Sequence, residues 1–174
     1  MKKLILLLVC LALCLSTVAC SIDNAPKKEQ NNGTQATTDN KGPQTFGLNE
    51  SAVFSSLKFT ATELEQSEGK DFFTPSEGNV FVGIKFTVEN ISEEEQSISS
   101  LLLFDSYADD VKASMSISAS CVFDEGTLDG SIAPGKKLVG WYAIEVPVGW
   151  KTIELQVQAN IWSNSSATFV FQNN

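Results

Sequence analysis

The sequence contains neither histidine nor arginine. Without histidine, the chain cannot form a Ser-His-Asp or Cys-His catalytic arrangement or a histidine-ligated zinc site. Without arginine, it lacks the side chain that pairs best with phosphate groups and with guanine. The 174 residues carry a formal net charge of −9, with 21 acidic residues against 12 lysines, and such a surface repels nucleic acid. We therefore expect no nucleic-acid partner.

Carboxylates are the catalytic groups that remain. Glycoside hydrolysis, for example, requires two carboxyl groups at a set separation on either side of a cleft. The sequence offers many acidic pairs, but no motif fixes one of them. We therefore predict that the protein is not an enzyme and has no cofactor. A small carboxylate-based surface hydrolase is the alternative.

The four cysteines do not form a disulfide framework. Cys10 and Cys14 lie in an apolar N-terminal run, and Cys20 follows it directly. If that run is removed and Cys20 is modified, Cys121 remains alone and has no partner within the chain. The alternation around Cys121 predicts a small, buried residue in a strand.

The first 20 residues have the layout of a bacterial lipoprotein signal. Two lysines precede an apolar run, Leu4–Leu15, that is shorter than the about 20 residues of a membrane-spanning helix. The stretch Thr17–Cys20 resembles a lipobox, in which the cysteine becomes the lipid-bearing first residue. We predict a signal peptide over residues 1–19 and acylation of Cys20. A conventional secreted protein that is cut near the same place is the alternative.

This signal predicts a lipid-anchored protein on the extracellular side of the cell membrane, with membrane lipid as the partner of acylated Cys20. Residues 20–45 are rich in Asn, Gln, Thr, Gly and Lys, and we expect them to form a disordered linker. A flexible chain of that length spans roughly 25–30 Å. Residues 46–174 then form one domain.

Apolar residues alternate with polar ones along most of this domain, which indicates half-buried strands. The clearest segment is NVFVGIKFTVEN, where Val80 to Val88 place every second residue on one face. The other segments are Val53–Phe59, Val111–Ile117, Leu138–Val146 and Ile153–Val157. Turn residues separate them, so we predict an all-β, antiparallel, immunoglobulin-like β-sandwich of about seven to eight strands. Leu101–Phe104 breaks the alternation, and we expect a strand that crosses between sheets or is buried on both faces.

Two groups of residues are candidates for binding. The first is Trp141, Trp150 and Trp162, because exposed aromatic residues anchor interfaces or stack on sugars. The alternative is that each tryptophan caps an open end of the core. The second group is Asp105, Asp109 and Asp110, whose oxygen atoms suit a weak calcium site, although their spacing matches no EF-hand loop. Solvated turn residues are the alternative for the aspartates.

The stretch GSIAPGKK, residues 130–137, is one residue short of a phosphate-binding loop. Such a loop follows a strand and opens a helix, so that backbone N–H groups face the phosphate. Here Pro134 removes one N–H group, and the residues after Lys137 alternate as a strand. We therefore predict a Pro-Gly turn between two strands and no nucleotide ligand.

Three stretches resemble a known family: VFVGIKFTVENIS, LLLFDSYADD and IAPGKKLVGWYAIEVPVGWKTIELQV. They are similar to telokin-like domains of unknown function in surface lipoproteins of Gram-positive bacteria. The resemblance implies an immunoglobulin-like fold and no agreed activity. Together with the signal, it predicts a lipid-anchored module that binds a protein, glycan or cell-envelope component without catalysis. A purely structural envelope lipoprotein is a further alternative.

Overall fold

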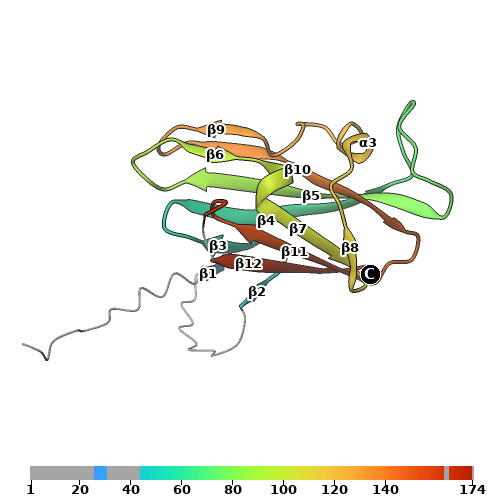
Figure 1. Cartoon of the computed structure of the whole chain (residues 1–174), viewed down its shortest axis with the longest axis horizontal. Helices are drawn as coiled ribbons and strands as arrows, with labels where there is room; N and C mark the ends of the chain where they lie inside the picture. Colours follow the sequence, from blue (N-terminus) through green and yellow to red (C-terminus); the bar gives the residue numbers. More distant parts are fainter. Residues whose placement is uncertain (1–25, 31–43, 163–164, 174) are drawn as a thin grey trace, which may run out of the picture.

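The computed structural model describes residues 26–30, 44–162 and 165–173, and in this part of the chain two five-stranded sheets pack face to face (Figure 1). The first sheet has the order β1 (Lys27–Gln30), β3 (Glu50–Val53), β4 (Leu57–Ser67), β5 (Asn79–Asn90) and β10 (Lys137–Pro147). The second has the order β2 (Thr45–Phe46), β12 (Ser166–Gln172), β11 (Thr152–Gln158), β7 (Phe104–Ala108) and β8 (Val111–Ala113). A small third sheet pairs β6 (Gln96–Ile98) with β9 (Gly130–Ile132). The predicted all-β sandwich is confirmed.

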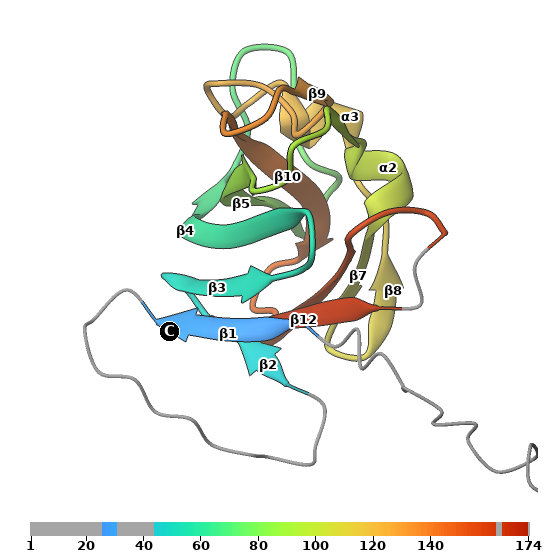
Figure 2. The same ribbon diagram turned by 90° about the vertical axis from the view of Figure 1, so that its left-hand side faces the viewer.

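Neighbouring strands are antiparallel except β2 and β12, which are parallel. The order within the sheets gives the molecule two ends. One end holds the start of β1, the start of β4 and the end of β5, and the other holds the connection from β4 to β5 (Figures 1 and 2). We call the first the β1 end and the second the β4–β5 end.

The alternation of β5 explains the main core. Val80, Val82, Ile84, Phe86 and Val88 all face the second sheet and are buried. Strand β10 pairs with β5 along its whole length, and its residues on the same face extend this apolar layer. Apolar side chains on one face of each sheet are thus removed from water together, which is the main stabilising contribution to such a fold.

A second, smaller core lies on the outer face of the first sheet. Phe81, Trp141 and Ala143 are buried there, beneath a segment of residues 114–128 that contains the short helix α3 (Ile117–Ser120). Phe123 of this segment stacks on Trp141, with 5.0 Å between ring centroids. We call this segment the outer cover.

A lysine fastens the outer cover to the sheet. The Lys85 ammonium lies 2.7 Å from a Glu125 carboxylate oxygen of the cover and 3.1 Å from Glu63 of β4. It also lies 5.4 Å from the Trp141 ring centroid, a cation–π distance. The hydrogen bonds to Glu125 and then to Glu63 raise the pKa of Lys85. The lysine is therefore charged at neutral pH and bridges strand and cover.

Several predicted strands are wrong in detail. Leu101–Phe104 is not one strand, because residues 100–103 form the short helix α2 (Ser100–Leu103) and only Phe104 begins β7. The strand predicted over 111–117 stops at Ala113, and Ile117 begins α3. Residues 53–59 span the turn between β3 and β4 instead of forming one strand. The described residues contain twelve strands, several very short, where seven to eight were expected.

The predicted N-terminal regions lie mostly outside the described residues. The signal peptide (1–19), Cys20 and residues 31–43 are in this group. Within the predicted linker, however, Lys27–Gln30 form β1 and pair with β3, so this part is a strand and not a disordered chain. None of the helices in the described ranges is long and apolar enough to cross a membrane.

Candidate functional site

The three tryptophans do not form one surface. Trp141 (4% exposed) lies beneath the outer cover, and its indole N–H has no hydrogen-bond partner among the described residues. Trp150 (2% exposed) lies in the main core, and its indole N–H donates to Gln66 at 3.2 Å. The prediction that both are candidate binding residues is therefore wrong for this structure, because burial leaves no ring face for a partner. Trp162 alone of the three is exposed (89%).

The three aspartates do not share a set of contacts either. Asp105 forms an ion pair with Lys112 across β7 and β8. Asp109 accepts hydrogen bonds from the backbone N–H groups of Lys151 (3.0 Å) and Thr152 (2.8 Å). Asp109 and Asp110 are the two turn residues between β7 and β8, both with positive φ angles. The described residues contain no group of three or more acidic, cysteine or histidine side chains that could hold a metal ion.

Cys121 is exposed, not buried as predicted. The prediction assumed that the strand alternation continued to residue 121. Instead, Cys121 is the C-cap of α3, which turns its side chain away from the sheet. Sequence periodicity could not show this, because apolar and serine residues alternate here by chance over a single helical turn.

The GSIAPGKK stretch forms the predicted turn. Residues 130–132 are β9, Pro134 and Gly135 form the turn, and β10 begins at Lys137. Gly135 has a φ of 69°, a conformation that glycine adopts without strain. The stretch opens a strand and not a helix, as expected.

Among the residues that the structure describes, the most exposed large apolar side chain belongs to Phe72, which is 98% exposed. It lies in residues 68–78, the connection from β4 to β5, which projects beyond both sheets (light green in Figures 1 and 2). We call this connection the β4–β5 finger. Phe73, the next residue, is 39% exposed.

Hydrogen bonds fix the tip of the finger. The Lys70 N–H donates to the Phe73 carbonyl at 2.9 Å, and the Phe73 N–H donates to the Lys70 carbonyl at 3.0 Å. This reciprocal pair leaves Asp71 and Phe72 as the two turn residues. Asp71 has a φ of 55°, which costs free energy in a residue other than glycine. The hydrogen bonds therefore fix the backbone of the turn, at which the Phe72 side chain is exposed to solvent.

A groove of about 620 Å³ lies at the base of the finger. Its lining residues come from the end of β4, the finger, the start of β5 and the turn before β11: Gln66, Ser67, Glu68, Thr74, Pro75, Ser76, Glu77, Gly78, Asn79, Val80 and Val148. Glu145 of β10 supports one wall, because its carboxylate accepts from the Asn79 side chain (2.9 Å) and the Ser76 N–H (2.8 Å). These hydrogen bonds, first that of Asn79, lower the pKa of Glu145. The groove is thus lined by two acidic residues, Glu68 and Glu77, and one wall is fixed by the hydrogen bonds of Glu145.

A second exposed apolar group lies at the β1 end. Leu101 and Leu102 of α2 and Ile161 and Trp162 of the β11–β12 loop are all exposed. Both views place this loop beside α2 (Figures 1 and 2). Trp162 was among the predicted candidates, but the two leucines were not, because the run LLLF suggested a buried strand.

Asp129 holds α2 in place. Its carboxylate accepts from the Ser100 backbone N–H at 2.9 Å and from the Ser100 hydroxyl at 2.6 Å. Burial by itself would raise the pKa of Asp129, but the hydrogen bonds from Ser100 and its neighbours outweigh burial and lower it. This explains how a helix of four residues persists with two leucines facing solvent.

A known family covers most of the domain. The domain of unknown function DUF4352 matches residues 46–167. The chain belongs to the DUF4352 family. No curated protein matches the sequence. The DUF4352 description does not mention telokin, so that part of the predicted resemblance remains a prediction.

Solved structures share the fold of this DUF4352 chain at low sequence identity. A β-sandwich protein from Clostridium difficile is 16% identical and has a TM-score of 0.52, covering 79% of this chain and 100% of its own. A secreted protein from Mycobacterium tuberculosis is 13% identical, with a TM-score of 0.55 and coverage of 77% and 100%. A candidate lipoprotein from Bacillus subtilis is 17% identical, with a TM-score of 0.56, and covers 67% of this chain. The chain spans only 36% of that protein's length. At these identities the likeness concerns the fold alone.

Proposed function

We propose that this DUF4352 chain is a lipid-anchored, noncatalytic module on the extracellular side of the membrane that binds a protein partner through the β4–β5 finger. The observation that carries the proposal is Phe72, a 98% exposed aromatic side chain on a hydrogen-bonded tip. Aromatic residues that fill a partner's pocket dominate many interfaces, and Phe72 together with the partly exposed Phe73 offers such a residue at the tip of the finger.

The position of the finger fits a protein held at its other end. Lys27 of β1 is level with Val53, and Val53 is level with Lys58 at the start of β4. Ser67, where the finger begins, lies nine residues beyond Lys58 on β4, which is about 30 Å in a strand. The finger is therefore presented away from the end at which the chain from Cys20 enters.

Charge supports a protein partner of a particular kind. Asp71 is next to Phe72, and Glu68 and Glu77 line the groove. Removal of residues 1–19 takes away two lysines and leaves 10 lysines against 21 acidic residues, a net charge of −11. We infer a partner with an apolar pocket for Phe72 and basic residues around that pocket. A glycan or another envelope component would make less use of a phenylalanine that carries no hydrogen-bonding group.

Phe72→Ala tests the interaction surface. We expect at least a tenfold loss of affinity for envelope proteins that the full chain captures, since truncation of an anchor residue costs about 2 kcal/mol or more. The measurement is a quantitative pull-down from cell-envelope fractions, followed by titration of each captured protein. Trp162→Ala is the matched control, because it truncates an exposed aromatic residue at the opposite end.

The outcomes separate the alternatives. Loss of binding in Phe72→Ala but not in Trp162→Ala supports the finger. The reverse result assigns binding to the group around Trp162 and contradicts the proposal. If neither wild type nor variant captures a saturable partner, the purely structural envelope lipoprotein is the better description.

Cys20→Ala tests the anchor. We expect wild type to fractionate with membranes and to incorporate a fatty-acid label, and the variant to do neither, because the substitution removes the thiol to which the proposed lipid is attached. Cys121→Ala is the control, since it removes an exposed thiol that the lipobox does not involve. Membrane fractionation of Cys20→Ala equal to that of wild type would contradict the anchor.

A further inference from the structure

Strand β1 consists of Lys27, Lys28, Glu29 and Gln30, and it forms one edge of the first sheet. It pairs in antiparallel register with β3, from Lys27 opposite Val53 to Gln30 opposite Glu50. The four residues include no apolar side chain, so burial of apolar side chains within β1 cannot hold the strand. Pro26, immediately before β1, is buried.

Ionic contacts bind β1 to the rest of the domain. The Lys28 ammonium lies 2.6 Å from a Glu50 carboxylate oxygen and donates to the Thr45 carbonyl of β2 at 3.1 Å. It also lies 5.7 Å from the Phe46 ring centroid. Lys28 thus connects β1 to strands of both sheets.

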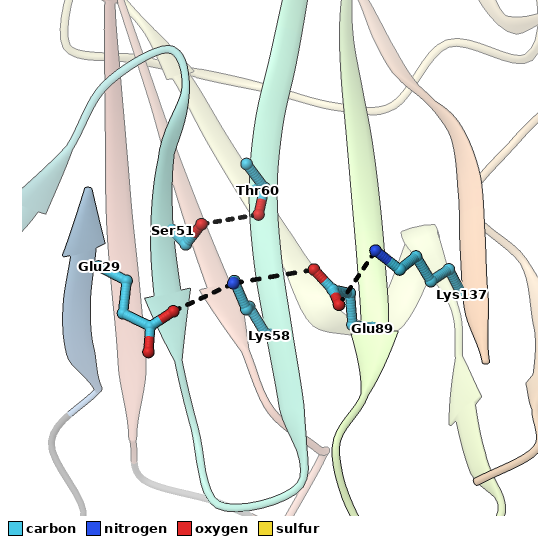
Figure 3. A network of polar contacts seen from close by, with 6 residues as sticks. All are labelled: Glu29, Ser51, Lys58, Thr60, Glu89 and Lys137. Carbon is cyan, nitrogen blue, oxygen red and sulfur yellow. Dashed lines mark hydrogen bonds and ion pairs between the residues drawn. The ribbon is translucent and has the colours of Figure 1, made fainter. Parts of the chain in front are cut away.

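Glu29 begins a line of alternating charges across the outer face of the first sheet (Figure 3). Its carboxylate lies 3.0 Å from the Lys58 ammonium of β4, which lies 3.8 Å from Glu89 of β5. Glu89 in turn lies 3.2 Å from Lys137 of β10. Beneath the first step of this line, Ser51 and Thr60 share a buried hydrogen bond of 2.8 Å that joins β3 to β4. The sheet next to β1 is therefore fixed by its own contacts, while β1 joins it through its backbone pairing with β3 and through partly exposed ion pairs.

We propose that β1 is a releasable strap that sets how far the domain can stand from the membrane. Ion pairs near the surface contribute only about 0.2–1 kcal/mol each, and β1 is an edge strand with no apolar side chain, so it can open locally without unfolding the sheets. Such pairs also weaken with salt, because the Debye length falls from about 10 Å at 0.1 M to about 3 Å at 1 M. A rise in ionic strength therefore shifts the equilibrium from docked to released β1.

The change in reach follows from chain length and rests on the proposed lipidation of Cys20. With β1 docked, Pro26 is six residues from Cys20, and a fully extended chain of that length spans at most about 20 Å. With β1 released, the first residue of the domain is Gln44, which is 24 residues from Cys20 and within at most about 80 Å. The docked strap keeps the β1 end near the bilayer and the β4–β5 finger at a fixed distance from it.

The strap also has a second effect on the sheet. While β1 is docked, it covers the edge of β3, whose backbone groups would otherwise be open to another strand. Release exposes that edge, so the released state has both a longer reach and an unpaired strand edge.

The double variant Lys28→Glu with Glu29→Lys tests docking without a change in composition or net charge. It places like charges at both ion pairs, a carboxylate at position 28 facing Glu50 and an ammonium at position 29 facing Lys58, and should release β1. We expect amide exchange in residues 50–53 to become roughly tenfold faster, as for the loss of two surface ion pairs and their replacement by repulsion. Wild type in about 1 M salt should change in the same direction.

A matched control exchanges Glu93→Lys with Lys136→Glu, two exposed turn residues outside this line of charges. Exchange in residues 50–53 should then equal that of wild type. These measurements use the mature chain carrying Cys20→Ala, so their result does not depend on lipidation. Equal exchange in wild type and the Lys28/Glu29 double variant overturns the strap.

Reach is measured on the lipidated chain in vesicles, by energy transfer from a dye at Cys121 to a dye in the bilayer. A locked variant with Lys27→Cys and Val53→Cys provides the docked reference, since these residues are register partners and such pairs accept a disulfide. In that variant the dye is attached after the disulfide has closed, when the exposed Cys121 is again the reactive thiol. Transfer should fall with salt in wild type and stay constant in the locked variant. A constant signal in wild type overturns the change in reach, whereas a chain absent from vesicles contradicts the lipid anchor instead.

Discussion

Phe86→Ala is expected to lower the free energy of unfolding by about 3–5 kcal/mol, the range for truncation of a buried phenylalanine. Phe86 is on β5 of the first sheet and is completely buried. Its ring lies 5.8 Å from that of Phe104 and 5.1 Å from that of Phe169, both edge-to-face and both on the second sheet. The substitution therefore leaves a cavity between the sheets and removes two aromatic contacts across it.

Urea unfolding followed by circular dichroism measures this loss. A cost of this size is a large fraction of the about 5–15 kcal/mol that stabilises a typical domain. Phe72→Ala is the matched control, because it makes the same chemical change at a 98% exposed position and should stay within about 0.5 kcal/mol of wild type. Phe86→Leu should cost less than Phe86→Ala and keeps the comparison measurable if the alanine variant does not fold. Equal midpoints for Phe86→Ala and Phe72→Ala would contradict the assignment of the core.

The contrast between these two phenylalanines shows what the sequence could predict. Phe86 belongs to a run of five alternating apolar residues, and that period requires a buried face whatever the tertiary structure. Phe72 and Phe73 lie between turn residues, where no period applies. Their exposure depends on the hydrogen-bonded turn of the finger, which only the folded chain shows.

The alternation along β5 also indicated that part of the outer face of the first sheet is covered. The face of β5 opposite the main core changes along the strand, from Phe81 and Gly83 to Lys85, Thr87 and Glu89. An apolar half on this face indicates that something covers it there. The segment that provides the cover could not be identified, because residues 114–128 have no regular period and reach the sheet through tertiary contacts.

Strand β1 could not be predicted from its own sequence. KKEQ has a low propensity for strands and no apolar period, so its composition favours disorder. Its backbone pairs with β3, and the charges of Lys28 and Glu29 match those of Glu50 and Lys58, which lie some 20 to 30 residues later in the chain. The pattern within one segment cannot show that its charges match those of another segment far along the chain. Leu101 and Leu102 were missed for a different reason, since the apolar run LLLF suggested a buried strand.

Gly83→Ala is expected to destabilise the protein by about 1–3 kcal/mol, the usual cost of overpacking. Gly83 is on the outer face of β5, opposite Ala143 of β10. A Cβ atom there would lie 2.8 Å from ring carbons of Phe123, closer than real contacts allow. Because Phe123 also stacks on Trp141, the added methyl group has to push the outer cover away from the sheet. The glycine is thus required by the close approach of an aromatic ring.

Urea unfolding gives the change in the free energy of unfolding, and tryptophan fluorescence reports whether the Trp141 ring becomes exposed to solvent. Gly47→Ala is the control, because a Cβ atom there has only Glu50 Oε2 within 4 Å, at 3.8 Å, and should change stability by less than about 0.5 kcal/mol. The cost of Gly83→Ala should shrink when Phe123→Leu is present, since the smaller side chain leaves room for the methyl group. An undiminished cost in that double variant would mean that Gly83 acts through the strand backbone and not through the outer cover.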